Sequence, residues 1–254
     1  MNTSALRIFG TTVLVAATLS ACGGSAGSAG AGANDAPGTG QVAATTAATP
    51  APAPSATPVR TYTQDELAAL VGGLKDAQGN ALTVMPAIDL AASLEQTKAA
   101  MRGMTVEPAE CSEQALAGVA PSADGAAVAV GTSTDAASGA STAVSMTSGL
   151  DEAFLAQIHD LAGQLKKCAT MSMTAGTIQL STNLTLLERV AALPAAVAFR
   201  TDTKISDGRQ QSMITVQAVQ RGVLLSVVAS GGASEQDAIA RAGALLDSAA
   251  ALIK

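Results

Sequence analysis

The sequence predicts an α+β fold, in which a central, mainly antiparallel sheet is packed by several helices, held by one disulfide and preceded by a disordered tether. From residue 61 onward, segments with helical periodicity alternate with segments rich in β-branched residues. The preceding segment is dominated by Gly, Ser, Ala, Thr and Pro, a composition that buries too little apolar surface to offset the entropy of ordering. Two cysteines, Cys111 and Cys168, lie in the part expected to fold.

The N-terminal residues have the layout of a bacterial lipoprotein signal. Arg7 forms a short positive region, residues 8–19 are apolar, and the sequence "LSAC" that ends at Cys22 resembles the lipobox at each position. The apolar run is shorter than the roughly 20 residues of a membrane-spanning helix. We therefore expect cleavage of the signal peptide, residues 1–21, and diacylation of Cys22. An ordinary secretory signal with a chance cysteine is the alternative.

These features predict a protein that is lipid-anchored to the cell membrane on its extracytoplasmic side. Two acyl chains give stable anchoring, because each buried methylene contributes roughly 0.8 kcal/mol and a single chain is marginal. Residues 22–60 would be the lipidated cysteine and a Gly/Ala/Pro-rich linker, with its Ala-Pro part the more extended. Residues 61–254 are long enough to form one extracytoplasmic domain with a real core.

Composition limits the functions open to this chain. The net charge of −6 argues against a nucleic-acid partner, because neutralising phosphates requires a basic face. Hydrophobic residues make up 48% of the chain but aromatic residues only 2%, so the core must be built from Ala, Val, Leu, Ile and Met. We expect no cofactor and no metal ion, since the single histidine, His159, has no companion ligands at a recognisable spacing.

The cysteine count predicts a disulfide. If Cys22 is acylated, Cys111 and Cys168 remain, and both would be exported to an oxidising compartment. A bond between them would close a loop of roughly 60 residues and stabilise the domain by about 3 to 4 kcal/mol in the chain-entropy model. Two buried thiols or a metal-binding pair are the alternatives.

Two helices are expected in the first part of the domain. Thr63 and Glu66 have capping-box spacing, and Gly72-Gly73 ends this helix. Apolar residues recur at helical spacing over 88–101, where acidic residues precede basic ones in the order that suits the helix dipole. Pro108 then forces an extended conformation on the residue before it.

A hairpin and a long helix are expected next. Segments 126–134 and 141–148 have the β-branched content of two strands, and a polar bend separates them. Over 150–168, large apolar residues fall on one helical stripe and two lysines occupy the last turn, where they suit the negative helix end. This pattern predicts one helix that delivers Cys168 to the core.

The C-terminal third predicts further strands and a closing helix. Segments 176–186 and 196–204 are strand-like, and 213–230 is interpreted as two strands joined at Gln220-Arg221-Gly222. The continuously apolar "VLLSVV" is typical of a central strand. After the expected N-cap Ser234, apolar residues at spacings of three and four predict a terminal helix that packs on the sheet.

The order of these parts resembles a family of mycobacterial domains. "EPAEC", a hairpin, a helix ending in "LKKC", and "ITVQAVQRGVLLSVVAS" before "AIARAGALL" are similar to the extracellular sensor domain of the receptor kinase PknH and to related stand-alone lipoproteins. The resemblance covers residues 61–254 and implies a mixed α/β sandwich with a cleft over its central sheet, which would bind and report a small ligand. Cys111 and Cys168 match the family's first cysteine pair. The family's Trp and second disulfide are absent from this sequence.

The sequence favours a protein that is not an enzyme. His159 would be the base of any Ser-His or Cys-His arrangement, yet no G-x-S-x-G motif is present and a disulfide would remove the free thiol. The acidic pairs at 65–66 and 151–152 are explained by helix starts, and Glu107 with Glu110 flanks a proline turn. We therefore assign no catalytic residue.

Two function classes remain open. The first is a binding module whose cleft takes a small molecule or an envelope lipid, with lipid carriage as a variant; its contact residues are not identified by any motif. Methionines could line such a pocket, although filling a core without aromatics is their commoner role: Met146, Met171, Met173 and Met213. The second class is a surface-interaction or structural cell-envelope lipoprotein without a ligand pocket. A concave apolar site with a few convergent polar groups would distinguish the first class from the second.

Overall fold

A computed structural model of the chain describes residues 60–112, 115 and 125–254. The expected signal peptide, Cys22 and most of the expected linker lie outside the described residues. The described residues from 60 to 254 belong to one compact unit.

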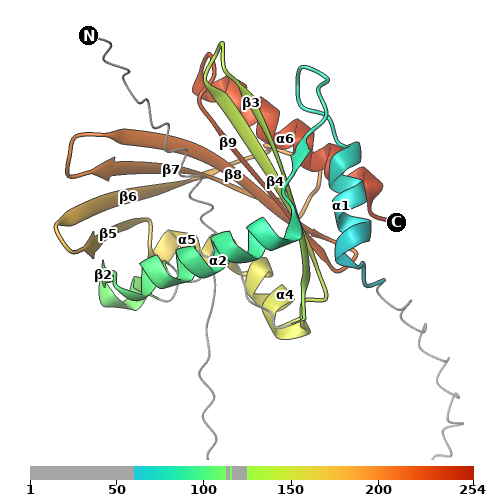
Figure 1. The fold of residues 1–254 in the computed structure, drawn as a ribbon. Helices are drawn as coiled ribbons and strands as arrows, with labels where there is room; N and C mark the ends of the chain where they lie inside the picture. Colours follow the sequence, from blue (N-terminus) through green and yellow to red (C-terminus); the bar gives the residue numbers. More distant parts are fainter. Residues whose placement is uncertain (1–59, 113–114, 116–124) are drawn as a thin grey trace, which may run out of the picture. The chain divides into compact units, whose positions relative to one another are not determined.

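Within the described part of the chain, nine strands form one sheet in the order β1-β3-β4-β9-β8-β7-β6-β5-β2, and every neighbouring pair is antiparallel (Figure 1). The strands are β1 (Thr83–Val84), β2 (Thr105–Glu107), β3 (Ala127–Asp135), β4 (Ala140–Ser148), β5 (Thr170–Ala175), β6 (Ile178–Leu187), β7 (Val197–Ile205), β8 (Gln210–Gln220) and β9 (Val223–Ser230). The predicted α+β class and antiparallel sheet are confirmed, and "VLLSVV" forms the central strand β9.

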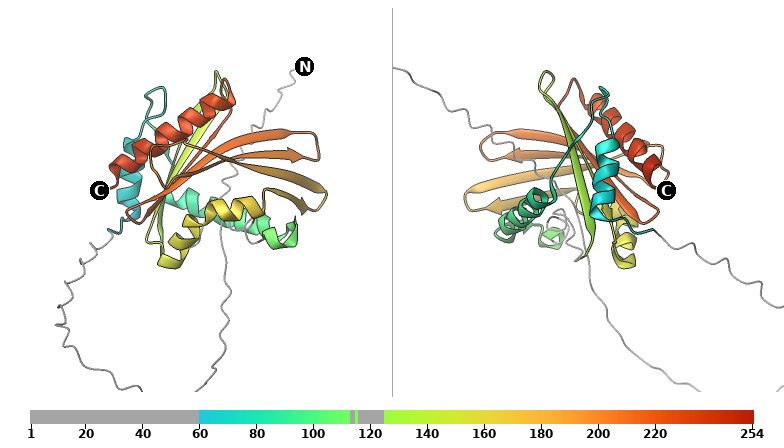
Figure 2. Two further views of the ribbon diagram at one scale, coloured as in Figure 1. Left: turned by 180° about the vertical axis from the view of Figure 1, so that it is seen from behind. Right: turned by 45° about the vertical axis from the view of Figure 1, so that its right-hand side comes forward.

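The helices flank this sheet. They are α1 (Gln64–Gly73), α2 (Ala87–Arg102), the 3₁₀ turn η1 (Ala109–Cys111), α4 (Glu152–His159), α5 (Leu161–Lys167) and α6 (Glu235–Leu252). In Figure 2, α1 and α6 lie on one side of the β3–β4 hairpin and α2 lies on the other.

One face of the sheet, here called the α6 face, carries the main core. The strand register places Val144, Val227 and Val216 side by side on this face, and all three are fully buried. Helices α1 and α6 cover them with fully buried Leu67 and Leu246. Farther along the same face, the strands β6, β5 and β2 present exposed polar side chains to solvent.

The opposite face, here called the disulfide face, has two smaller apolar clusters. In the first, Leu161 and Leu165 of α5 pack on Phe199 of β7. In the second, the disulfide packs with Val106 of β2 and Met171 of β5. The disulfide face is therefore closed by small local clusters over the outer strands, in place of one continuous core.

Local sequence signals explain several element ends. Thr63 and Glu66 form the predicted capping box at the start of α1. Ser234 caps α6 by accepting a hydrogen bond from the backbone N–H of Asp237 at 3.1 Å. Arg221 and Gly222 both have positive φ, which is the geometry of the tight turn predicted between β8 and β9.

The structure differs from the sequence-based prediction in two places. The single helix expected over 150–168 is divided at Asp160, whose φ of −91° and ψ of 4° end α4 before α5 begins. Asp is a poor interior helix residue because its side chain competes for backbone hydrogen bonds, and Gly163 further lowers helix propensity here. The short strands β1, β2 and β5 were not predicted, since their pairing depends on distant partners.

Candidate functional site

The two faces of the sheet differ sharply in charge. The unbroken register of all eight strand pairs assigns every strand residue to one face. Among the residues described, no strand places a charged side chain on the disulfide face. The α6 face, by contrast, carries five charged residues: Glu107, Asp135, Arg200, Asp202 and Lys204.

A polar row crosses the middle of the uncharged disulfide face. Gln217 of β8, Ser226 of β9 and Ser145 of β4 are direct cross-strand neighbours. Val197 of β7 and Val130 of β3 extend the row at its two ends. We call these five residues the Gln217 row.

Gln217 is the unusual member of the row. Its side chain is 4% exposed, and its Nε2 donates a hydrogen bond to Ser226 Oγ at 3.2 Å. Its Oε1 is buried and has no hydrogen-bond partner among the described residues. Turning the amide over would pair Oε1 with the Ser226 hydroxyl but would leave the NH₂ group unpaired instead. In either orientation one end of a buried amide lacks a partner.

A second amide with a buried oxygen lies in the helix that packs on the same strand, on a side chain that is otherwise only partly buried. Helix α4 contacts β8, and it carries Gln157, whose Oε1 is also buried without a hydrogen-bond partner. Buried polar groups are paired in nearly all folded proteins, so each such group calls for an explanation. These two are the only such side-chain atoms in the part of the chain that the structure describes.

The surroundings of the Gln217 row are apolar yet not part of a continuous core. Val130 and Leu224 on the disulfide face are each 7% exposed, and neither belongs to one of the three apolar clusters formed by described residues. Val197, at the β7 end of the row, packs against the cluster of Leu161, Leu165 and Phe199. Ser226 and Ser145 are only partly buried. The row therefore runs from a buried amide on β8 toward more accessible hydroxyl groups on β9 and β4.

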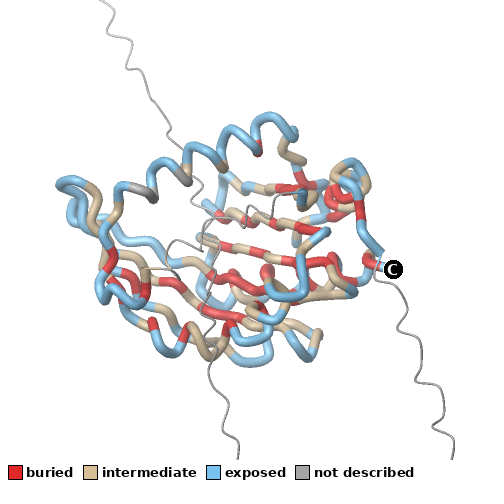
Figure 3. Tube along the Cα trace, turned by 90° about the horizontal axis from the view of Figure 1, so that it is seen from below, coloured by how far each residue is buried: buried red, intermediate tan, exposed pale blue. Residues whose placement is uncertain are grey.

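Helix α2 lies on this side of the sheet and is mostly exposed. In Figure 3 it is the long helix at the top, exposed along nearly its whole length, and Leu90 is its one buried residue among those whose burial is described. Ile88 near its start is 78% exposed. A helix with so small a buried stripe contributes little apolar packing to the sheet below it.

The ionisable groups with shifted pKa values lie away from the Gln217 row. Hydrogen bonding to Glu235, and the nearby Asp202 carboxylate, raise the pKa of Arg200 on the α6 face. The hydroxyl of Ser133 donates to Asp76 at 2.6 Å and lowers the pKa of that carboxyl, with further help from backbone N–H groups. Neither of these groups faces the row, so the row itself is electrically neutral.

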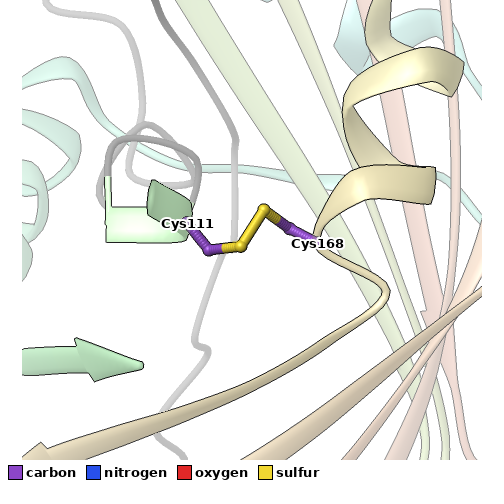
Figure 4. Close-up of a disulfide and its surroundings, with 2 residues drawn as sticks. All are labelled: Cys111 and Cys168. Atoms are coloured by element: carbon purple, nitrogen blue, oxygen red, sulfur yellow. A yellow bond between two sulfur atoms is a disulfide. The ribbon is translucent and has the colours of Figure 1, made fainter. Parts of the chain in front are cut away.

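The structure contains the predicted disulfide. Cys111 at the end of η1 and Cys168 at the end of α5 are bonded, with their Cα atoms 5.7 Å apart (Figure 4). Both are buried. The bond ties the segment around β2 to the end of α5 and so fixes one end of the disulfide face.

The other residues considered from sequence lie in different places. His159 is exposed in the last turn of α4. Met146 is fully buried in the core of the α6 face, as the commoner role of methionine predicts, and Met171 and Met173 pack beside the disulfide. Met213 lies on the disulfide face and is partly buried. Cys22 lies outside the described residues.

Membrane-spanning helices and metal clusters were also sought. Among residues 60–112, 115 and 125–254, no helix is long and apolar enough to cross a membrane. The same residues include no group of three or more His, Cys, Asp or Glu side chains arranged to hold a metal ion.

Sequence reasoning did not single out Gln217. The signal was present, because a long uncharged amide interrupts the near-continuous apolar run "MITVQAV" of a central strand. Burying such an amide is costly unless it finds hydrogen-bond partners in the folded protein. No local sequence pattern shows whether it does.

Comparisons with known proteins find solved structures that resemble this chain, and two of them are mycobacterial. The extracellular domain of PknH from Mycobacterium tuberculosis matches with a TM-score of 0.48 and 12% identity, over 77% of this chain and 98% of that one. A protein from Mycobacterium smegmatis, described as the Rv0999 ortholog, matches with a TM-score of 0.40 and 13% identity, over 68% of this chain and 85% of that one. No family model and no curated protein matches the sequence.

Proposed function

We propose that this chain is a lipid-anchored, extracytoplasmic binding protein that holds a small molecule at the Gln217 row and performs no chemistry on it. The observation that carries the proposal is the buried, unpaired amide of Gln217 on an uncharged sheet face. Leaving such a group without a partner costs about 1 to 3 kcal/mol. A bound ligand that supplies the missing hydrogen bond would recover this free energy on binding.

The neighbourhood of Gln217 suits a binding site better than a core. Ligand sites combine apolar walls with a few polar groups that converge on one place. Here the walls would be Val130, Val197 and Leu224, and the polar groups would be Gln217 with its hydroxyl-bearing neighbours. A core position with the same burial would be better filled by leucine, because leucine has no polar group that needs a hydrogen-bond partner.

Two independent features support the extracytoplasmic location. The disulfide between Cys111 and Cys168 is of the kind that persists in oxidising compartments. The signal-like segment ending in "LSAC" supplies an export route and a lipid attachment point at Cys22. Replacing Cys22 with alanine should abolish incorporation of labelled palmitate in a bacterial host that processes lipoproteins. Continued labelling of that variant would contradict the anchor.

Native mass spectrometry of residues 61–254, exported by such a host and purified without detergent, tests the binding function. We expect an extra mass that dissociates on denaturation. Gln217→Leu should lose this mass, while its unfolding free energy in the absence of ligand should stay equal or rise, because the unpaired amide is gone. Gln210→Leu is the matched control, since Gln210 lies on the same strand but is exposed on the α6 face.

Three results would contradict the proposal. One is a bare wild-type domain, which would favour the alternative of a surface-interaction lipoprotein without a ligand. Another is an extra mass that Gln217→Leu retains. A third is a large loss of stability in ligand-free Gln217→Leu, which would make the amide a structural group of the fold.

A further inference from the structure

We infer that the ligand of the Gln217 row is a neutral alcohol, in which a hydroxyl group meets the amide and an attached carbon skeleton lies along the apolar wall. This inference rests on the proposed function and adds the chemical class of the ligand. Three properties of the row lead to it: its lack of charge, the two-sided hydrogen-bonding need of the amide, and the apolar residues on both sides.

The lack of charged side chains on this face of the sheet argues against ionic ligands. A carboxylate, phosphate or ammonium group loses several kcal/mol of hydration when it is buried, unless an opposite charge or several strong hydrogen bonds replace the lost water. The described strands place no charged side chain on the disulfide face. An ionic group next to Gln217 would therefore find no counter-ion on the sheet.

The hydrogen-bonding argument selects a hydroxyl group. With Nε2 on Ser226, the free Oε1 needs a donor; with the amide turned over, the free NH₂ needs an acceptor. A hydroxyl group donates and accepts, so it satisfies Gln217 in either orientation. A ketone or an ether oxygen accepts only, and it would satisfy just one of the two.

The apolar wall indicates what the hydroxyl is attached to. Along the row, Val130 and Val197 stand at the ends, and Leu224 lies on β9 beside Ser226. Apolar surface of this kind gains roughly 25 cal/mol for each Å² removed from water. A fully hydroxylated sugar offers little apolar surface to contact these residues, whereas an alcohol with a hydrocarbon portion would cover them.

Three small probes of matched length separate these possibilities: hexane-1,2-diol, hexanoate and hexylamine. Each is titrated into residues 61–254 while the side-chain NH₂ signals of Gln217 are followed by NMR, with Gln210 as the internal control. We expect the diol to shift the Gln217 signals in a saturable way and the two ionic probes to leave them unchanged. In Gln217→Leu, backbone signals of Ser226 should report diol binding weakened by about tenfold or more, equivalent to roughly 1.4 kcal/mol.

The outcomes separate this inference from the proposed function. If hexanoate or hexylamine shifts the Gln217 signals and the diol does not, the site binds ligands but the inferred chemistry is wrong. The inference is overturned if none of the probes shifts the Gln217 signals. It is also overturned if NMR shows that the Gln217 side chain contacts only a long-lived water molecule. In that case the native mass spectra of the exported wild-type protein and of Gln217→Leu decide whether the proposed binding function holds.

Discussion

The α6 face and the disulfide face belong to the same nine strands but are filled in different ways. On the α6 face, helices α1 and α6 cover the central strands with one continuous core, which includes fully buried Val144, Val216 and Leu246. On the disulfide face, two small clusters lie over the outer strands, and the centre holds the Gln217 row. One face thus serves mainly for stability, while the other retains an unsatisfied polar group at its centre.

This difference shows how one sheet can carry a firmly packed core on one face while its other face is less completely packed. Helix α1 packs closely against β3 on the α6 face, because a Cβ atom on Gly131 of β3 would overlap the side chain of Val71 of α1. Arg241 of α6, only 6% exposed, anchors the helix through hydrogen bonds to backbone carbonyls of Ser141, Ser230 and Gly231. With α6 held in this way, the strands stay in place whether or not the other face is fully packed.

The largest expected effect comes from adjacent residues on opposite faces. Leu225 is fully buried on the α6 face, and Leu224 is 7% exposed on the disulfide face. Leu225→Ala should lower the unfolding free energy by about 3 to 5 kcal/mol, and Leu224→Ala by about 2 kcal/mol or less, because fewer packed neighbours surround it. Urea unfolding of both variants measures the difference. Equal losses would show that the two faces are packed alike.

The disulfide should stabilise its own face most directly. Replacing both Cys111 and Cys168 with alanine should cost about 3 to 4 kcal/mol, since the bond closes a long loop of chain. Hydrogen exchange should then rise first in β2 and β5, which join the sheet beside the bond, while β8 and β9 stay protected. Uniform loss of protection through all strands would contradict a local response of the outer strands beside the bond.

A smaller effect is expected at the caps of two helices. Ser234→Ala removes the side-chain cap of α6 and should cost about 1 kcal/mol of global stability. Asp151→Ala removes the cap of α4, the short helix that carries Gln157. Its effect should be confined to faster hydrogen exchange within α4. If Asp151→Ala lowers global stability as much as Ser234→Ala, α4 is as firmly integrated as α6.

The smallest effect concerns pH at the edge of the α6 face. The hydrogen bond from Ser133 holds the pKa of Asp76 below its usual range. A carboxyl with a lowered folded-state pKa stabilises the protein above its ordinary pKa, and this contribution is lost as pH falls through the lowered value. Asp76→Asn should therefore be less stable than wild type near pH 7, and the difference should vanish in acid.

Urea unfolding at several pH values measures this difference. Asp89→Asn, at an exposed position of α2, is the matched control. A stability difference between Asp76→Asn and wild type that stays constant into acid would contradict the role assigned to the Ser133 hydrogen bond.

Much of this architecture could be predicted from local sequence. Thr63 with Glu66 predicted the start of α1, Ser234 predicted that of α6, and Arg221-Gly222 marked the turn between the central strands. The Cys111–Cys168 bond was also predicted, on the basis of export and cysteine number. These features depend on a few neighbouring residues or on composition, so a single sequence is enough to indicate them.

The sequence by itself determined the α+β class and the ends of the long elements, because capping, turn and periodicity signals act within a few residues. Tertiary structure alone decided the short strands β1, β2 and β5 and the partner of each buried polar group. Gln217 illustrates the physical reason. Whether its amide finds a donor depends on side chains from other strands and helices, and their positions are set only when the whole sheet has assembled.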